Sequence, residues 1–322
     1  MWNNYPEILA ELNIIEEYIK KNVCSRNRLL SDIVNGLINS GGKRMRPALT
    51  VIGASFGSYN REKVVSIAGA LEILHTATLV HDDIIDRSAL RRGRTTVSEQ
   101  YGMDLAVYTG DFLFTKAVLM LSKDITVDKL DVVAKSVKTI CEGEVDQYQG
   151  KFDAGTSVLS YLKRINRKTA VLFGASCGLG AYAGDCGEEM ARKLAKFGFY
   201  YGMAFQIRDD INDFVSKEDK QGKPVYKDLT EGVITLPAIL SLKKNLAVKK
   251  SLEEIMGRKG SAGFKEISQL AEMIKESGGV NEAGRLLDKY VERGRKLLEA
   301  FPESVYKTML LNLIGALRVQ SL

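Results

Sequence analysis

Residues 61–86 read REKVVSIAGALEILHTATLVHDDIID. Apolar residues recur in this stretch about once per turn of a 3.6-residue helix. They fall at Val65, Ala68, Leu71, Ala77 and Val80. The spacing predicts a long apolar helix that ends in a group of aspartates.

The same helical period recurs along the chain. The segments that show it are 103–122, 127–150, 157–184, 187–215, 235–247, 264–276, 280–300 and 302–318. Breaks that contain glycine fall at 40–42, 91–94, 222–224 and 277–279. The sequence has no Val-rich alternation bounded by tight hairpin turns, so a β-sheet has little support. We predict an all-α fold.

The composition is that of a soluble globular protein, with 45% hydrophobic and 27% charged residues. No linker rich in proline, glycine or serine divides the 322 residues, so we predict one domain that spans 1–322. The net charge of +6 suits an anionic ligand, an acidic membrane surface or nucleic acid. Nucleic acid is the least favoured, because no long Lys/Arg run carries interleaved aromatics.

We expect a cytoplasmic protein without an integral membrane segment. Residues 1–20 carry four glutamates among apolar positions, which is typical of an amphipathic helix and not of a secretory signal. The longest uncharged stretch, 169–184, is shorter than the roughly 20 residues needed to cross a bilayer. The four cysteines form no CxxC pair, so we interpret them as buried thiols in a reducing cytoplasm.

Two DDxxD patterns, at 82–86 and 209–213, each follow an apolar helical stretch. Residues four apart on a helix share a face, so the first and last carboxylates of each pattern repel one another. A divalent cation removes this conflict, and hard oxygen ligands select Mg²⁺ or Ca²⁺. Mg²⁺ fits best, because it shares its shell with substrate phosphates and needs few carboxylates.

Three alternatives to a magnesium site fit the acidic patterns less well. For a single DDxxD, a solvated acidic helix end accounts for the pattern about as well as a metal site, but two copies favour the metal. A di-iron bundle requires Glu-x-x-His ligands, which the two histidines, His75 and His81, do not supply. The glycine and glutamate spacing of an EF-hand loop is also missing.

Cations stand at four breaks between helices, where they would bind an anionic diphosphate. They occur in GGKRMRP at 41–47, RRGR at 91–94, Lys168-Thr169 and GKP at 222–224. Arginine grips phosphate bidentately and lysine acts as a point charge. No Ser-His-Asp or Cys-His arrangement stands out, which favours metal-assisted departure of diphosphate from carbon, because that chemistry needs no protein nucleophile.

Together these motifs resemble the trans-isoprenyl diphosphate synthases, or polyprenyl synthetases. The matching stretches, in order, are GGKRMRP at 41–47, LHTATLVHDDIID at 74–86, RRGRTT at 91–96, GDFLF at 110–114, KT at 168–169, FQIRDDINDF at 205–214 and GKPVYKDLTEGVITLP at 222–237. The resemblance implies a helical bundle around a central cavity, normally a homodimer. It also implies a Mg²⁺-dependent prenyltransferase that condenses isopentenyl diphosphate with an allylic diphosphate.

The resemblance also assigns residue roles. Mg²⁺ would be held by Asp82, Asp86 and Asp209, with Asp83, Asp210 and Asp213 in support. The allylic diphosphate would bind Arg91, Lys168 and Lys223, and isopentenyl diphosphate would bind Lys43, Arg46, His75 and Arg92. Thr169 and Gln206 would line the reacting carbons, next to Phe205. One position departs from many members, which carry a lysine where this chain has Val233. On the sequence alone, a core histidine is the favoured interpretation of His75, and only the resemblance makes it a ligand.

Product length should depend on the apolar wall below Asp82, formed by Ala77, Thr78, Leu74 and Leu71. Short-chain members place bulky aromatics where Ala77 and Thr78 stand. Opening one helical turn, about 5.4 Å, admits about one more isoprene unit. We therefore expect a product longer than geranylgeranyl, such as a quinone side-chain precursor, and expect Ala77→Phe to shorten it.

Four alternatives stay open at this point. The chain could make geranylgeranyl or farnesyl diphosphate, or be the catalytic subunit of a heteromeric synthase. A terpene cyclase on the same scaffold is less favoured, because it has no need of the isopentenyl-binding residues Lys43, Arg46 and Arg92. A non-catalytic helical protein with acidic patches is remote, because the motifs occur in order along the whole chain.

Overall fold

The computed structural model describes residues 2–215, 226–242 and 245–318, and the all-α prediction is confirmed. The chain divides into two compact units. The first comprises Met1–Ala134 and Ala175–Ala195, and the second comprises Lys135–Gly174 and Lys196–Leu322. Their boundaries fall inside the helices α7 (Val127–Gln149), α9 (Val171–Ala183) and α10 (Glu188–Val215).

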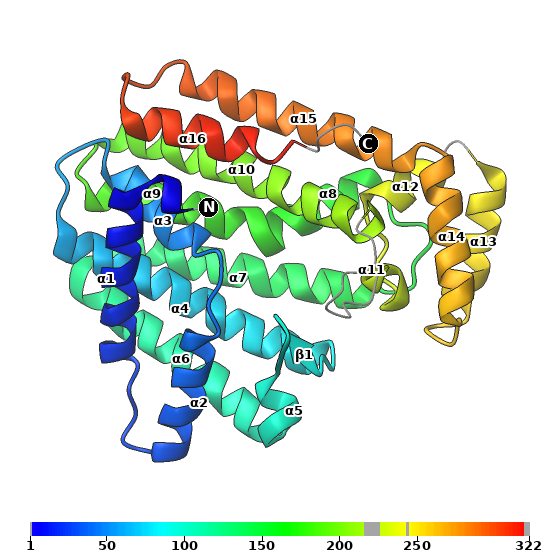
Figure 1. The fold of residues 1–322 in the computed structure, drawn as a ribbon, viewed down its shortest axis with the longest axis horizontal. Coiled ribbons are helices and arrows are strands. Elements are labelled where there is room, and N and C mark those ends of the chain that lie inside the picture. The colour runs from blue at the N-terminus through cyan, green and yellow to red at the C-terminus, as the bar shows by residue number, and fades with distance from the viewer. Residues whose placement is uncertain (1, 216–225, 243–244, 319–322) are drawn as a thin grey trace. The chain divides into compact units, whose positions relative to one another are not determined.

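The first unit contains six complete α-helices, one 3-10 turn and one short hairpin. They are η1 (Trp2–Asn4), α1 (Pro6–Asn22), α2 (Arg28–Asn39), α3 (Met45–Ala54), α4 (Arg61–Ile85), α5 (Val97–Tyr101), α6 (Met103–Asp124) and the strands β1 (Leu90–Arg91) and β2 (Arg94–Thr95). The helix α4 packs against α1, α3 and α6, so it forms the centre of this unit (Figure 1).

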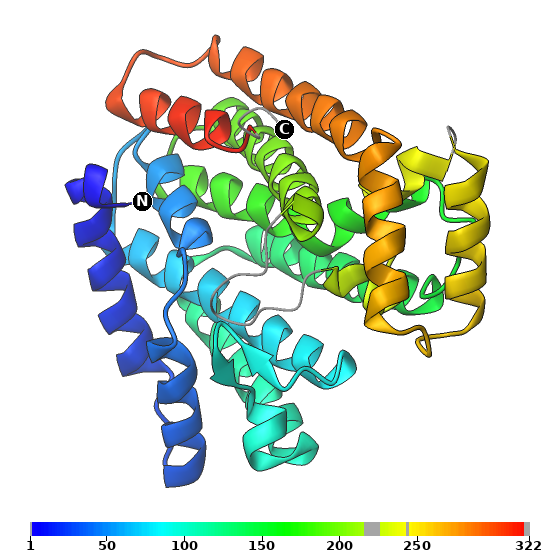
Figure 2. The same cartoon turned by 45° about the vertical axis from the view of Figure 1, so that its right-hand side comes forward.

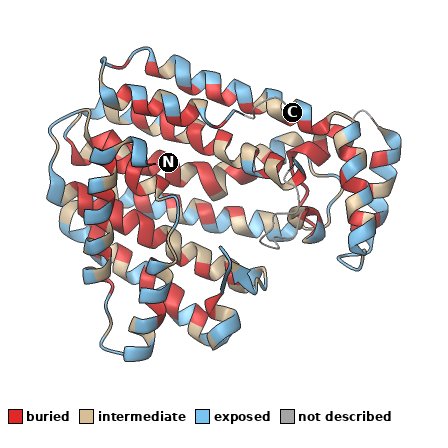
Figure 3. Ribbon diagram, in the orientation of Figure 1, coloured by how far each residue is buried: buried red, intermediate tan, exposed pale blue. Residues whose placement is uncertain are grey.

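The long apolar stretch read from the sequence is the helix α4. It begins after Asn60, whose side chain accepts a hydrogen bond from the Lys63 N–H at 3.2 Å. From Val64 to Leu74 every residue is buried, as Figure 3 shows in red. A helix that is apolar on all sides needs neighbours on all sides, which explains its central position.

The helices α4 and α6 approach closely at the end of α4. A Cβ atom at Gly110 would lie 2.2 Å from Nε2 of His81, so a larger residue there would displace the imidazole. The imidazole of His81 also lies 3.4 Å from Asp111 of α6. Gly110 therefore lets α6 pack beside the acidic end of α4.

Arg91 and Arg94 face one another in the hairpin β1–β2, a small exception to the expectation of no sheet. The two residues between them, Arg92 and Gly93, have φ values of 53° and 74°. Two positive φ angles are what a two-residue type I′ turn requires. The glycine-containing break at 91–94 is thus a hairpin turn.

The second unit contains the remaining helices of the described chain. They are α8 (Val158–Ile165), a π-helical turn η2 (Asn166–Ala170), α11 (Lys227–Thr230), α12 (Leu236–Leu242), α13 (Leu246–Gly257), α14 (Phe264–Glu276), α15 (Gly279–Leu298) and α16 (Val305–Gly315). Within this unit α13 lies alongside α14, and α15 alongside α16 (Figures 1 and 2). The helix α13 was not predicted separately from the sequence.

The prediction that all four cysteines are buried is wrong. Cys177 is buried and Cys186 partly exposed, but Cys24 and Cys141 are exposed.

Two helices are long and apolar enough to cross a membrane by length and composition. In α4 the apolar window is 72% buried, as in the core helix of a soluble protein. In α6 the window is 39% buried, and exposed apolar side chains follow its surface. The expectation of no membrane segment stays a prediction.

Candidate active site

The first aspartate cluster lies at the C-terminal end of α4. The helix ends at Ile85, and the N–H of Asp86 donates to the carbonyl of Asp82 at 2.8 Å. Carboxylates are unfavourable at this end, because the helix dipole is negative there. The last turn of α4, all of it described, has no basic residue. A bound cation would relieve this electrostatic conflict.

Asp83 occupies a different face of the same turn. Its side chain is buried, and Oδ1 accepts a hydrogen bond from Nε of Arg91 at 2.7 Å. The hairpin β1–β2 thereby carries Arg91 to the acidic end of α4. The predicted diphosphate ligand Arg91 and the predicted supporting residue Asp83 are thus brought together.

Several cations of the first unit surround His75, one of the predicted isopentenyl diphosphate ligands. Burial and positive charge lower the pKa of His75 well below its usual range. The cations responsible are Arg46, Arg92, Arg91 and Arg44. His75 is therefore a neutral imidazole at physiological pH, able to donate a hydrogen bond to a diphosphate. A cavity of about 40 Å³ opens beside it, lined by Arg44, Glu72, Arg91 and Arg92 among others.

The four residues predicted to set product length differ in exposure. Leu71, Leu74 and Ala77 are buried in the first unit. Thr78 is partly exposed, and it lies one turn before Asp82 on the same face of α4. Of the four, Thr78 is the side chain placed to meet a ligand held by Asp82.

The second cluster lies near the end of α10, in the second unit. Asp209 is exposed, whereas Asp210 is buried. The hydroxyl of Tyr161 donates to Oδ2 of Asp210 at 2.6 Å, and Nε2 of Gln206 donates to Oδ1 at 2.8 Å. Burial raises the pKa of Asp210 to about 7, although both hydrogen bonds oppose this shift.

Asp213 faces the start of the short helix α11. Its carboxylate accepts the backbone N–H groups of Lys227 at 3.1 Å and of Asp228 at 3.3 Å. Burial also raises the pKa of Asp213 and that of Asp228, and the neighbouring carboxylates add to the effect. Asp213 therefore holds the start of α11.

The π-helical turn contains Lys168 and Thr169, two of the predicted catalytic residues. Lys168 Nζ lies 2.8 Å from Oε1 of Glu144. Thr169 Oγ1 donates to Oε1 of Gln206 at 2.8 Å, so the chain of contacts continues through Gln206 to Asp210. Extra residues in a helical turn change the direction of the side chains that follow, and such turns are frequent at functional sites.

Three further expected positions belong to the second unit. Phe205 stacks on Tyr201, with ring centroids 6.2 Å apart, and remains partly exposed. Lys223 lies outside the described residues. Val233 is buried, and its N–H donates to the carbonyl of Asp228 at 2.8 Å, so this position presents no cation. A buried arginine, Arg164, lies nearby and donates to the carbonyl of Ile234 at 2.7 Å.

Comparison with known proteins agrees with the motifs and their geometry. The sequence model of the family described as "Polyprenyl synthetase" matches residues 27–274. The chain belongs to the polyprenyl synthetase family. The resemblance drawn from the sequence is thereby confirmed.

Individual relatives cover almost the whole chain. "Heptaprenyl diphosphate synthase component 2" of Geobacillus stearothermophilus is 35% identical over 96% of this chain and 95% of its own. The crystal structure of heptaprenyl diphosphate synthase from Staphylococcus aureus superposes with a TM-score of 0.91 at 35% identity, over 96% of this chain and 97% of that one. A geranylgeranyl pyrophosphate synthase from Lactobacillus brevis also gives 0.91, at 29% identity and 98% coverage of each chain. The chain is thus a prenyltransferase of the all-α isoprenoid synthase fold.

Sequence reasoning missed several residues of this polyprenyl synthetase's candidate site. They are Tyr161, Arg164, Glu144 and Asp228, which contact or surround the predicted residues. Each is separated from its partner by many residues, so spacing along the chain carried no signal for the first three. Asp228 stands in the quoted stretch GKPVYKDLTEGVITLP, where it is the first acidic residue after GKP and was available as a signal.

The resemblance implies Mg²⁺, and the candidate site supplies carboxylate oxygens for this ion. Among the described residues, no three His, Cys, Asp or Glu side chains converge into a ready-made metal cage. Mg²⁺ needs none, because it is usually held by one or two carboxylates together with waters and substrate phosphates. Asp82 and Asp86 at the negative end of α4, and the repelling carboxylates near Asp209, have the hard oxygens and the excess negative charge that such an ion offsets. The residues fit Mg²⁺.

Proposed function

We propose that this chain elongates an allylic diphosphate with isopentenyl diphosphate and makes a trans-prenyl diphosphate longer than geranylgeranyl diphosphate. The bond between C1 of the allylic substrate and its diphosphate oxygen breaks, and C1 bonds to C4 of isopentenyl diphosphate. A proton leaves C2 of the isopentenyl unit and passes to the released diphosphate. The carbon skeleton grows by five carbons per cycle.

The observation that carries this proposal is the group of cations around neutral His75. A second diphosphate, that of isopentenyl diphosphate, requires such a site, whereas a terpene cyclase has no use for it. Lys43 from the loop before α3, Arg46 from the first turn of α3 and Arg92 from the hairpin would bind its phosphate oxygens. His75 would add a hydrogen bond without adding charge.

The allylic diphosphate would be held through Mg²⁺ by Asp82, Asp86 and Asp209. When bound, the metal supplies positive charge that stabilises the departing diphosphate. Arg91 and Lys168 would contact the same diphosphate, and so would Lys223. Asp83 and Glu144 hold Arg91 and Lys168 in place, because each forms a direct ion pair with its cation.

Thr169 and Gln206 would line the reacting carbons. The hydroxyl of Thr169 is committed to Gln206, and the amide of Gln206 is committed to Asp210. Their remaining lone pairs and the carbonyl of Gln206 form a polar, uncharged surface that can stabilise the positive charge on the allylic fragment without attacking it. Phe205 would add an aromatic face for the same cation.

Product length would depend on the side chains one and two turns below Asp82. Small residues at Ala77 and Thr78 support a long product, and the two heptaprenyl diphosphate synthases named above are similar to this chain. Because Ala77 is buried, a phenylalanine there would also strain the core. Thr78→Phe is the cleaner test, because Thr78 is partly exposed. We expect shorter products from Thr78→Phe with an unchanged melting temperature; unchanged products would refute the role of this wall in product length.

We also propose that the protein is a cytoplasmic homodimer. Exposed apolar side chains follow one helix of the first unit, α6: Met103, Val107, Tyr108, Phe114 and Leu119. An apolar face of this kind is unfavourable in water and favours association with a second copy. Light scattering of the purified chain tests this: Phe114→Glu should shift a dimer toward monomer, whereas a wild-type monomer would contradict the proposal.

Incubation of the purified chain with farnesyl diphosphate, labelled isopentenyl diphosphate and Mg²⁺ tests the activity itself. We expect discrete longer prenyl diphosphates by chromatography, and their loss with EDTA or Asp82→Ala. Asp32→Ala removes an exposed carboxylate of α2 and serves as a matched control with unchanged activity. No incorporation from folded wild-type protein would contradict self-sufficient synthesis.

One observation favours a second candidate function. The relative from Geobacillus stearothermophilus is named component 2, which indicates a synthase of more than one component. Under this alternative the chain would be the catalytic subunit and would need a partner. Incorporation that begins only when a second protein is added would distinguish this case from the homodimer.

A further inference from the structure

The loop between α2 and α3 has an unfavourable backbone conformation. Gly41, Gly42 and Arg44 have φ values of 71°, 153° and 47°. The left-handed region is unfavourable for a residue with a Cβ atom, and Arg44 is such a residue. Contacts from outside the loop must therefore hold it in this shape.

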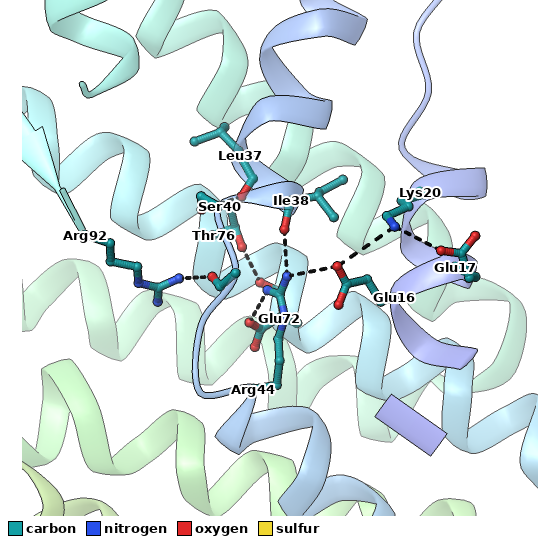
Figure 4. A network of polar contacts seen from close by, with 11 residues as sticks. Glu16, Glu17, Lys20, Leu37, Ile38, Ser40, Arg44, Glu72, Thr76 and Arg92 are labelled. Carbon is teal, nitrogen blue, oxygen red and sulfur yellow. Dashed lines mark hydrogen bonds and ion pairs between the residues drawn. The ribbon is translucent and has the colours of Figure 1, made fainter. Parts of the chain in front are cut away.

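Backbone carbonyls of this loop and of the end of α2 accept hydrogen bonds from three side chains. Trp2 Nε1 donates to the carbonyl of Lys43 at 2.7 Å. Arg92 donates to the carbonyl of Gly41, and Arg44 donates to the carbonyl of Ile38 at 2.8 Å (Figure 4). The loop is thus fixed from the N-terminal segment on one side and from the hairpin on the other.

The guanidinium of Arg44 also forms an ion pair with a buried carboxylate of α4. Its Nη1 lies 2.8 Å from Oε1 of Glu72, and the two side chains are 14% and 7% exposed. Glu16 of α1 lies 3.8 Å from the same guanidinium, and Lys20 lies beyond it (Figure 4). The charge of Arg44 is therefore matched inside the protein by Glu72.

We infer that Trp2, Arg44 and Glu72 are positioning residues that fix the loop so that Lys43 and Arg46 meet isopentenyl diphosphate. This inference rests on the proposed function. Arg44 stands between two predicted ligands in GGKRMRP, yet its charge serves the loop and not the diphosphate. Glu72 lies one turn before His75 on α4, so it places the loop against the helix that carries this ligand.

Trp2 gives this inference an optical signal. The 322-residue chain contains one tryptophan, so its fluorescence reports on one place. Trp2 is 8% exposed, and its indole N–H is bonded to the residue that would contact the ligand. A diphosphate bound at Lys43 would bring negative charge next to this indole and so change its surroundings, even when the loop keeps its shape.

The first test is a fluorescence titration of the full chain with isopentenyl diphosphate alone. We expect a saturable change in tryptophan emission, shifted to roughly tenfold higher concentration by Arg46→Ala, which removes a charge-assisted hydrogen bond. Binding measured by calorimetry without any emission change would overturn the inference. Failure of the proposed function is distinguishable, because then the wild-type chain would bind no isopentenyl diphosphate by either method.

The second test is steady-state kinetics of Trp2→Phe and Glu72→Gln. Trp2→Phe keeps an aromatic ring and removes the N–H donor. We expect the KM for isopentenyl diphosphate to rise about three- to tenfold, as for loss of one hydrogen bond, with kcat and the KM for farnesyl diphosphate within about twofold of wild type. Glu17→Gln is the matched control, because Glu17 is an exposed carboxylate at the edge of the same network.

Two outcomes would overturn the assignment. One is an unchanged KM for isopentenyl diphosphate in Trp2→Phe, and the other is an equal rise in the KM of both substrates. If Glu72→Gln fails to fold, Trp2→Phe still decides the question, because it leaves the buried ion pair intact.

Discussion

The two aspartate clusters share one sequence pattern and have different surroundings. At the end of α4, Asp83 forms an ion pair with Arg91. At the matching position near the end of α10, Asp210 accepts hydrogen bonds from two neutral residues, Tyr161 and Gln206. In the first cluster the inner carboxylate, Asp83, is balanced by a cation. In the second cluster the corresponding carboxylate, Asp210, is balanced by the dipoles of neutral groups.

This difference shows which features of a site a DDxxD pattern specifies. Helical geometry alone places the first and last carboxylates on one face and rotates the second by about 100° to another. Accordingly, Asp83 is 6% and Asp210 4% exposed, whereas Asp82 and Asp209 are more exposed. The pattern separates a ligand-facing pair from an inward residue, but it does not determine what the inward residue contacts.

The largest expected effect separates these two roles in catalysis. We predict that Asp82→Ala and Asp209→Ala each lower kcat about 10²- to 10³-fold, as for loss of one strong electrostatic stabiliser of the transition state. Asp83→Asn and Asp210→Asn should lower kcat by less than about tenfold. Product formation with saturating substrates and Mg²⁺ measures both. Equal losses in all four variants would refute the division into outward and inward carboxylates.

The second prediction concerns stability, where the inward residues should differ. Asp83→Asn leaves the guanidinium of Arg91 without its carboxylate and should lower the free energy of unfolding by about 1–3 kcal/mol, a value reduced because Arg91 is partly exposed. Asp210→Asn removes a buried charge whose partners are neutral, so the loss should be under about 1 kcal/mol. Urea unfolding without Mg²⁺ measures both free energies. A larger loss in Asp210→Asn than in Asp83→Asn would contradict the comparison of the two clusters.

The sequence predicted the surroundings of the two aspartate clusters only in part. At the first cluster it predicted the helix but not the contacts of the inner carboxylate. The helix was expected to run to the aspartates, and α4 spans Arg61–Ile85. The partner of Asp83 was not foreseeable, because it depends on the left-handed conformation of Arg92 in a turn without the usual Asn-Gly or Asp-Gly signal. The sequence indicated a break at Gly93, but it did not indicate that this break is a hairpin turn.

The sequence predicted a continuous helix over 157–184. The structure has a π-helical turn at Asn166–Ala170 instead. No glycine or proline interrupts NRKTA, so local propensity gave no signal. Packing supplies the constraint: a Cβ atom at Gly202 would lie 2.6 Å from the Cα of Ala170, so α10 and this turn touch closely. Contacts distant in sequence, and not local pattern, orient Lys168 and Thr169.

The third prediction uses the cation-rich surroundings of the first cluster. The pKa of His75 is lowered, so below its ordinary value of 6.5 the unfolded chain takes up a proton that the folded chain refuses. Stability from this residue is therefore complete above about pH 7 and is lost as pH falls, at most by about 1.4 kcal/mol per pH unit. The charged groups that face it are Arg44, Arg46, Arg91, Arg92 and Glu72.

His75→Gln should remove this part of the pH dependence, because glutamine does not titrate. The measurement is the free energy of unfolding of both proteins between pH 5 and 8. The free energy of unfolding of the wild type should fall relative to that of His75→Gln as the pH decreases below about 7, and the difference between the two proteins should be constant above about pH 7. A constant difference over the whole pH range would mean that burial and the neighbouring cations do not lower the pKa of His75, and the contrast between the two clusters would weaken.

The smallest effects should have opposite signs at the last aspartate of each pattern. Asp86 follows the C-terminal end of α4, where a negative charge is unfavourable, so Asp86→Asn should stabilise the metal-free protein by about 0.3–1 kcal/mol. Asp213 accepts one N–H group at the start of α11 on each of its two oxygens, and asparagine has only one acceptor oxygen, so Asp213→Asn should destabilise the protein by a similar amount. Thermal unfolding in EDTA measures both, and a shared sign would show that the helix ends do not govern these carboxylates. If Asp86→Asn raises the free energy of unfolding and also lowers the activity, this carboxylate serves to bind a ligand and destabilises the fold that carries it.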